Sequence, residues 1–192
     1  MNFGLIIIGD EILSGKRQDK HLAKVIELLG ARGLSLAWAQ YLGDDPARIT
    51  AALRSAFASG DVVFSCGGIG ATPDDHTRQC AAAALERPLA LHPEARELIM
   101  ARVAELAAEQ GWTADPDHPD TIHRLNMGVF PEGAEIIPNP YNQIPGFAVG
   151  DVHFVPGFPV MAHPMIEALL DGAYAGLHGS HVQAERSVIV MG

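Results

Sequence analysis

The sequence predicts an α/β fold, a three-layer α/β/α sandwich built around a mostly parallel sheet. Short apolar runs typical of buried strands alternate with segments of helical periodicity along the 192-residue chain. Glycine-containing loops follow three of these runs, as expected where parallel strands end next to a ligand. With 48% hydrophobic residues the chain can bury one core. We expect one domain over residues 1–177 and a tail, 178–192, with a strand-like end.

Composition limits the partners and the compartment. The formal net charge of −10 argues against a nucleic-acid surface and against an anionic membrane. Cys66 and Cys80 form no CxxC pair, which favours reduced thiols in a cytoplasmic protein. The apolar run at residues 5–8 is too short for a signal peptide or a membrane span.

The amino-terminal elements follow the expected alternation. Residues 3–8 are an unbroken apolar run, typical of a strand buried on both faces, and residues 9–15 form an acidic, glycine-containing loop at its end. Apolar residues three and four apart predict a helix over 20–31, and alternating polarity predicts a strand over 34–42. Asp45 and Pro46 are typical of the cap and first position of a helix that ends near residue 60.

The central elements surround the most informative stretch. Residues 62–64 predict a buried strand, and a helix is expected from Thr72 to about Glu86. Residues 88–91 are expected to be a connector. Pro93 to Gln110 is the longest helical pattern, closed by a glycine, with an inward face of Ala95, Leu98, Ile99, Val103, Leu106 and Ala107.

The carboxy-terminal elements complete the alternation. Residues 113–119 are rich in breakers and predict a loop, and residues 136–147 predict a shaped loop between short strands. A strand at 151–155 leads into a third glycine loop, Pro156 to Pro159, and a helix through Leu170. Residues 186–191 have a strand-like composition.

The loop after the 62–64 strand suits an anion. Gly67, Gly68 and Gly70 allow positive φ and close approach of a ligand. Thr72 as helix cap and Pro73 at the first helical position would leave free backbone N–H groups at a helix start, where phosphates bind. The alternative is a plain helix cap, because Thr72 followed by Asp75 is close to a capping box.

Acidic residues near two of the loops suggest a metal. A phosphate beside Asp74 and Asp75 would be repelled unless a divalent cation accompanied it, and Mg²⁺ takes carboxylate and phosphate oxygens. Asp10, Glu11 and Asp19 suit metal ligands, ribose contacts or a general base. Their alternative role is that of solvated loop acids, with Asp19 capping the next helix.

Three stretches together resemble the MoaB/Mog molybdopterin-binding family, in particular its branch that includes the amino-terminal domain of CinA (competence/damage-inducible protein A). The stretches are residues 9–15, with Asp19 following, residues 67–77 and residues 156–159. The resemblance covers roughly residues 3–175. It implies a three-layer domain, often trimeric, that holds a molybdopterin or an adenine nucleotide with Mg²⁺ or another divalent cation.

The resemblance also assigns roles to residues. It implies that Asp75 and Asp19 are the functional acids. We expect Asp75 to hold the metal, together with Asp10, Asp19 or Asp74. The residues expected to contact the pterin or nucleotide come from all three loops: Gly9, Asp10, Glu11, Ser14, Gly15, Gly67, Gly68, Ile69, Gly70, Ala71, Thr72, Pro156 and Gly157.

Three functions stay open at this point. The first is a molybdopterin-binding protein of the MoaB/Mog type, which either transfers an adenylyl group or only binds the pterin. The second is a metal-dependent pyrophosphatase of the CinA type acting on ADP-ribose or FAD; Asp74, where Mog-like proteins usually carry Arg, favours this branch. The third is a binding or scaffold module without turnover, which the loop at residues 140–143 and Met161 favour.

Overall fold

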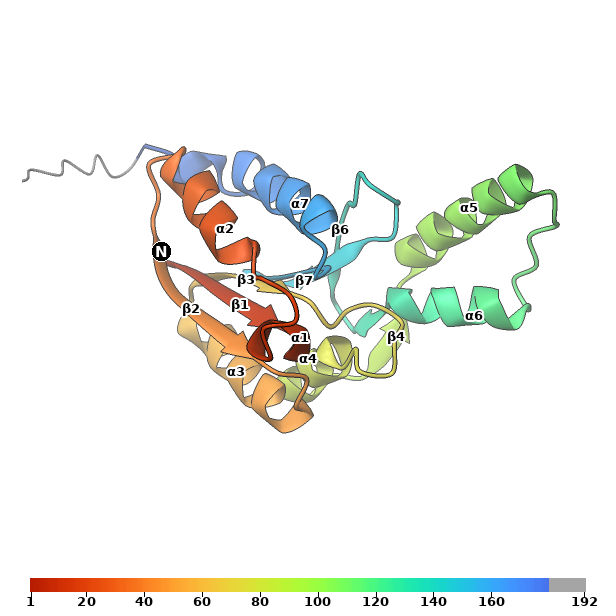
Figure 1. Cartoon of the computed structure of the whole chain (residues 1–192), viewed down its shortest axis with the longest axis horizontal. Helices are drawn as coiled ribbons and strands as arrows, with labels where there is room; N and C mark the ends of the chain where they lie inside the picture. Colours follow the sequence, from red (N-terminus) through yellow and green to blue (C-terminus); the bar gives the residue numbers. More distant parts are fainter. Residues whose placement is uncertain (180–192) are drawn as a thin grey trace, which may run out of the picture.

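The computed structural model describes residues 1–179 of the chain (Figure 1). Within this range six strands form the central sheet, in the order β2-β1-β3-β8-β7-β6. The four strands at one side are parallel to one another: β1 (Phe3–Ile8), β2 (Leu36–Leu42), β3 (Val62–Cys66) and β8 (Val152–Val155). β7 (Gly146–Val149) runs antiparallel to both β8 and β6 (Glu135–Ile137). The predicted mostly parallel sheet is confirmed.

Two helical layers enclose the sheet. α2 (His21–Gly30) and α7 (Pro159–Asp171) cover one face, and α3 (Pro46–Ser59) and α4 (Thr77–Leu85) cover the other (Figure 1). β1 is buried along its whole length because its side chains alternate between two cores. Phe3, Leu5 and Ile7 pack toward α2 and α7, whereas Ile6 and Ile8 pack toward α3 and α4. The expected α/β/α sandwich is therefore confirmed.

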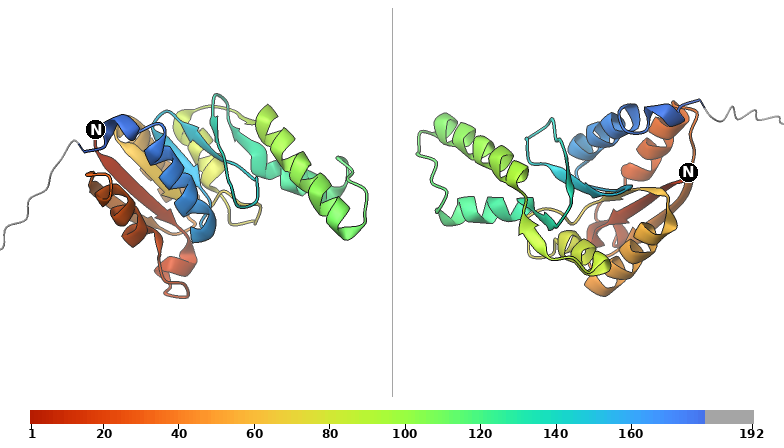
Figure 2. Two further views of the ribbon diagram at one scale, coloured as in Figure 1. Left: turned by 90° about the horizontal axis from the view of Figure 1, so that it is seen from above. Right: turned by 180° about the vertical axis from the view of Figure 1, so that it is seen from behind.

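An arm projects from the sandwich. It consists of α5 (Pro93–Gln110), α6 (Pro119–Leu125), the short η1 (Asn126–Gly128) and a two-stranded antiparallel sheet of β4 (Leu89–Leu91) and β5 (Val129–Pro131). Figure 2 shows α5 and α6 extending away from the central sheet in two further views. Four of the six residues predicted to face inward on α5 are buried: Ala95, Ile99, Val103 and Ala107.

The sequence-based boundaries need four corrections. α4 begins at Thr77 and not at Thr72, because Asp75 bonds back to Thr72 and closes a turn. The acidic loop contains a single helical turn, α1 (Asp10–Leu13). The connector at 88–91 is a strand, because β5 pairs with it from about forty residues further along the chain. α6 was not predicted, since its seven residues are too few to show a periodicity.

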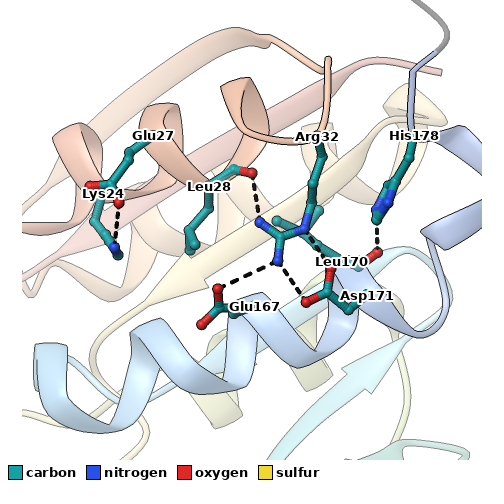
Figure 3. Close-up of polar contacts among 8 residues, drawn as sticks. All are labelled: Lys24, Glu27, Leu28, Arg32, Glu167, Leu170, Asp171 and His178. Atoms are coloured by element: carbon teal, nitrogen blue, oxygen red, sulfur yellow. Dashed lines mark hydrogen bonds and ion pairs between the residues drawn. The ribbon is translucent and has the colours of Figure 1, made fainter.

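Arg32 joins the two helices of one layer (Figure 3). Its Nε and Nη2 each donate to one oxygen of Asp171 at 2.6 Å, and its Nη1 donates to the Leu28 carbonyl oxygen at 2.8 Å. The end of α2 is thereby held against the end of α7. Nearby, the His178 ring bonds the carbonyl of Leu170 at 2.8 Å, just after η2 (Ala175–Leu177).

Two other expectations concern the carboxy-terminal run and a membrane-spanning segment. The strand-like run at 186–191 lies outside the described residues. Among residues 1–179, no helix has both the length and the apolar character needed to cross a bilayer.

Candidate functional site

The loops after β1, β3 and β8 meet at one edge of the sheet. Parallel strands place their carboxyl ends together there, and in such folds ligands bind at that edge. The three loops, with the end of β2, surround a hollow of about 510 Å³, large enough for a small ligand. Most of the predicted site residues line it: Gly9, Glu11, Gly67, Gly68, Ile69, Gly70, Ala71, Thr72, Asp74, Asp75, Pro156 and Gly157.

The loops contact one another through glycine backbone. Gly67 has φ +108°, and a Cβ there would lie 2.3 Å from the Ile8 carbonyl oxygen at the end of β1. A Cβ on Gly157 would lie 3.3 Å from the Gly67 Cα. A side chain at Gly67 would therefore clash with the backbone of β1, whereas one at Gly157 would fit only tightly against the glycine loop.

Two residues at the start of α4 fix the glycine loop. Thr77 is fully buried; its N–H donates to the Gly68 carbonyl at 3.0 Å and its hydroxyl to the Gly67 carbonyl at 3.1 Å. Arg78 is 5% exposed, and its Nη2 donates to the Gly70 carbonyl at 2.7 Å. Burial lowers the pKa of Arg78. Neither residue was singled out from the sequence, because a helix starting at Thr72 would place both in its second turn.

The glycine loop presents unused donors. The N–H groups of Gly68, Ile69, Gly70 and Ala71 donate to no atom within residues 1–179. The Ile69 side chain is buried in the core beneath α3 and α4, which anchors this row of N–H groups beside the hollow. Since α4 starts later than expected, an anion here would meet the loop N–H groups and not a helix end.

Acidic side chains face these donors. Asp75 accepts from the Thr72 N–H at 2.8 Å and the Thr72 hydroxyl at 2.5 Å, both through Oδ2. This arrangement retains the reciprocal bond of a capping box but closes a turn instead of starting a helix. Asp74 and Glu11 also line the hollow.

Asp44, just after β2, also belongs to this acidic rim. Its carboxylate accepts from the Asp10 N–H at 2.9 Å, and its own N–H donates to the Asp10 carboxylate at 3.1 Å. Burial raises the pKa of Asp44, and the nearby charges of Asp10, Asp74 and Glu11 raise it further. The rim is therefore a place where negative charges repel one another.

Asp19 occupies a different position. Its carboxylate accepts from the N–H groups of His21 and Leu22, at 2.8 and 3.1 Å, and from the Tyr41 hydroxyl at 2.7 Å. Burial acts to raise its pKa, but these hydrogen bonds outweigh burial and lower it. The capping role is thus observed, while its catalytic role stays a prediction. Asp10, Ser14 and Gly15 likewise lie outside the lining of the hollow, in and just after α1.

His21 positions the third loop. It is buried, and its Nε2–H donates to the Gly157 carbonyl oxygen at 3.1 Å, which places the ring proton on Nε2. Burial lowers its pKa. No local pattern predicts this contact, because its two residues lie 136 positions apart in the sequence.

The donor set suits a hard cation but does not form a complete cage. Within residues 1–179 no three His, Cys, Asp or Glu side chains come close enough together to hold a metal ion by themselves. Carboxylate oxygens are nevertheless the ligands that Mg²⁺ prefers, and Mg²⁺ usually keeps water and phosphate oxygens in its shell. The metal roles of Asp75, Asp74 and Asp10 stay predictions.

The four parallel strands, the three glycine loops and the acidic rim define a domain of the MoaB/Mog type. The family model described as "Probable molybdopterin binding domain" matches residues 4–174. The chain belongs to this molybdopterin-binding domain family.

Individual relatives refine this assignment. A CinA-like protein of Syntrophotalea carbinolica is 30% identical over 200 residues, which cover 100% of this chain and 45% of that protein. A CinA-like protein of Anaeromyxobacter dehalogenans is 33% identical over 164 residues, 83% of this chain and 38% of that protein. The chain therefore spans less than half the length of these curated relatives.

Solved structures of CinA and MoaB proteins have the same fold as this chain. The crystal structure of CinA from Thermoplasma acidophilum has a TM-score of 0.74 at 27% identity and covers 89% of this chain and 98% of its own. MoaB from Thermus thermophilus shares the fold, with a TM-score of 0.53 at 22% identity and coverage of 92% and 94%.

Proposed function

We propose that the chain binds a phosphate group of a pterin or nucleotide on the N–H groups of residues 68–71, with Mg²⁺ beside it. The observation that carries this proposal is the row of four unused donors next to a hollow of about 510 Å³. Backbone N–H groups that converge on a concave surface bind anions without a side chain.

The charge around the hollow favours a cation beside a bound phosphate. Glu11, Asp44, Asp74 and Asp75 line it, and the single lining cation, Arg17, pairs with Glu11 at 3.2 Å. A phosphate would add negative charge to this rim. Asp75, with Asp74, would hold Mg²⁺, which supplies charge neutralisation to a phosphoryl group when bound.

Calorimetric titration tests this function. ADP-ribose, FAD, ATP and molybdopterin would be titrated into the protein with and without Mg²⁺, together with Asp75→Asn and the control Asp115→Asn on the exposed arm. Asn retains an oxygen that can accept the Thr72 bonds, so the fold should persist. We expect Asp75→Asn to weaken Mg²⁺-dependent binding at least about tenfold and the control to change nothing. Equal binding by both variants would contradict the proposal.

A second candidate is hydrolysis of a dinucleotide pyrophosphate. Two observations favour it. Asp74 stands where Mog-like proteins usually carry Arg, and the TM-score to CinA is higher than that to MoaB. Water would add to one phosphorus and the bridging P–O bond would break, giving AMP and ribose 5-phosphate from ADP-ribose. Chromatography of AMP released by the wild type and by Asp75→Asn decides between turnover and binding alone.

Assembly is a separate proposal. Resemblance to the family predicts a homo-oligomer, in particular a trimer. Light scattering on the purified chain would measure its mass directly.

A further inference from the structure

Two histidines meet beside the third loop, near the amino-terminal ends of the neighbouring helices α2 and α7 (Figure 1). His21 is the first residue of α2, and His163 lies in the second turn of α7. Their ring centroids are 5.3 Å apart, and the ring planes are nearly perpendicular, at 87°. Neither side chain lines the hollow described above, so the pair is separate from the proposed phosphate site.

Each of the two rings has a buried nitrogen without a hydrogen-bond partner among residues 1–179. On His163 this atom is Nε2, and on His21 it is Nδ1. The Nε2–H of His21 donates to the Gly157 carbonyl, so its Nδ1 carries a free lone pair, in a side chain that is only 4% exposed. A buried nitrogen without a partner costs free energy that a bound ion would recover.

The spacing of the rings suits two ligands of one metal ion. Zn²⁺ binds imidazole nitrogens at about 2.0–2.1 Å, so two rings at a tetrahedral angle have centroids about 5 Å apart. The observed separation of 5.3 Å agrees with this value. Imidazole suits Zn²⁺, Cu²⁺ and Ni²⁺, whereas Mg²⁺ takes oxygen ligands. The histidine pair therefore suits a different class of metal from the acidic rim.

The surroundings of the pair also suit a cation. A metal-binding histidine usually donates its other ring N–H to a backbone carbonyl or a carboxylate, and His21 already does so to Gly157. The Asp19 carboxylate, which caps α2, brings negative charge near both rings. The nearby Lys24 ammonium is paired with Glu27 at 2.6 Å.

We infer that His21 and His163 bind one divalent transition-metal ion of the Zn²⁺, Cu²⁺ or Ni²⁺ class, through Nδ1 of His21 and Nε2 of His163. Water completes the coordination shell, because the described residues bring no third His, Cys, Asp or Glu side chain into such a group. His163 is partly exposed, which gives the ion and this water access. The bound ion joins the starts of α2 and α7 as Arg32 joins their ends. The inference does not depend on the proposed function.

Calorimetric titration of Zn²⁺ in the presence of excess Mg²⁺ tests the site. His163→Gln and His21→Gln each remove one ligand, and Gln at position 21 keeps an N–H donor for the Gly157 carbonyl. His123→Gln, which replaces an exposed histidine on α6, is the matched control. Asp75→Asn reports on any Zn²⁺ held by the acidic rim. Electron paramagnetic resonance of bound Cu²⁺ counts the coordinated nitrogens, and thermal unfolding checks the fold of each variant.

We expect one Zn²⁺ per chain, bound at least about tenfold more weakly by His163→Gln and by His21→Gln. His123→Gln and Asp75→Asn should bind it as the wild type does. Zn²⁺ at about 100 times its dissociation constant should raise the melting temperature of the wild type by about 5–10 °C, and His163→Gln should lose this shift. The Cu²⁺ spectrum should show coupling to two nitrogens in the wild type and to one in each of these two variants.

Failure of the folded wild type to bind Zn²⁺ or Cu²⁺ would overturn the inference. Equal Zn²⁺ binding by the wild type and His163→Gln would overturn it too, and this comparison decides alone should His21→Gln not fold. Zn²⁺ binding that survives in the histidine variants and is lost in Asp75→Asn would assign the ion to the acidic rim. That result would overturn the histidine site and leave the proposed phosphate site intact.

Discussion

Substitution of Gly68 by alanine tests how the glycine loop is held. Gly68 has φ +70°, and a Cβ there would lie 2.1 Å from the Thr77 hydroxyl oxygen. The new methyl group would push this hydroxyl away from the Gly67 carbonyl, which it now bonds at 3.1 Å. The substitution thus combines a backbone penalty with the loss of a buried hydrogen bond.

The two contributions have known sizes. A left-handed conformation costs an L-residue about 1–2 kcal/mol relative to glycine. A buried carbonyl left without its partner costs about 1–3 kcal/mol more. We therefore expect Gly68→Ala to lower the free energy of unfolding by about 2–5 kcal/mol.

Gly60 supplies a matched control. It ends α3 with φ +71°, and a Cβ there would meet no atom within 4 Å. Gly60→Ala should therefore cost only the backbone part, about 1–2 kcal/mol. Urea unfolding of both variants measures the difference. Equal destabilisation by the two substitutions would refute the argument.

A double-mutant cycle sharpens the same test. Thr77→Ala removes the hydroxyl, so its cost should be nearly absent when Gly68→Ala has already displaced that group. We expect the double variant to be more stable than additivity predicts by about 1–2 kcal/mol. Strict additivity would mean that the Gly68 methyl group does not act through Thr77.

Three further predictions concern the rest of the fold. Burial lowers the pKa of His153 to about 4. As the pH falls below 6.5, this histidine therefore binds a proton in the unfolded chain but stays neutral in the folded chain, which favours unfolding. The free energy of unfolding should keep its full value above pH 6.5 and decrease by up to about 3 kcal/mol toward pH 4. His153→Gln keeps a donor for the Tyr174 hydroxyl, and the urea midpoint of this variant should depend less on pH over the same range. Arg32→Met should lower the urea midpoint clearly more than Lys24→Met, because Lys24 makes one exposed ion pair whereas Arg32 links two helices (Figure 3). A larger effect of Lys24→Met would contradict the role of Arg32 in holding α2 against α7. Cys66 and Cys80 are buried, and burial raises the pKa of both thiols. A disulfide reagent at pH 8 should therefore label neither cysteine before the protein unfolds. Fast labelling of the native protein would show instead that the thiols are accessible.

Local patterns predicted most of the sandwich. The apolar run of β1 is a strand buried on both faces, and Asp45 caps α3, with Pro46 at its first position, as expected. These elements were predictable because neighbouring residues determine them. β4 was not, since three residues form a strand only when a distant segment pairs with them.

The start of α4 shows why a correct local motif can be placed in the wrong structure. The bond from the Thr72 N–H to Asp75 is part of a capping box and equally part of a turn. What decides between them is the contact of Thr77 with Gly67, which depends on β3 and α4 packing together. Sequence spacing alone contains no information on that contact.

The candidate site likewise contains residues that local motifs predict and residues that they do not. Its three loops could be predicted because each has a short local motif: glycines with acids in the first two, and a glycine between prolines in the third. Asp44, Arg78 and His21 were missed because their partners, Asp10, Gly70 and Gly157, become neighbours only in the folded chain.

The floor of the hollow consists of peptide groups held at glycines that admit no side chain. Gly67 and Gly68 have no room for even one methyl group. Adaptation to a new ligand would therefore act on the surrounding side chains, such as Glu11, Asp44 or Asp74, while the glycine motif stayed the same. Two relatives with identical motifs can then differ in what they bind, and a change in specificity should be sought in the walls and not in the floor.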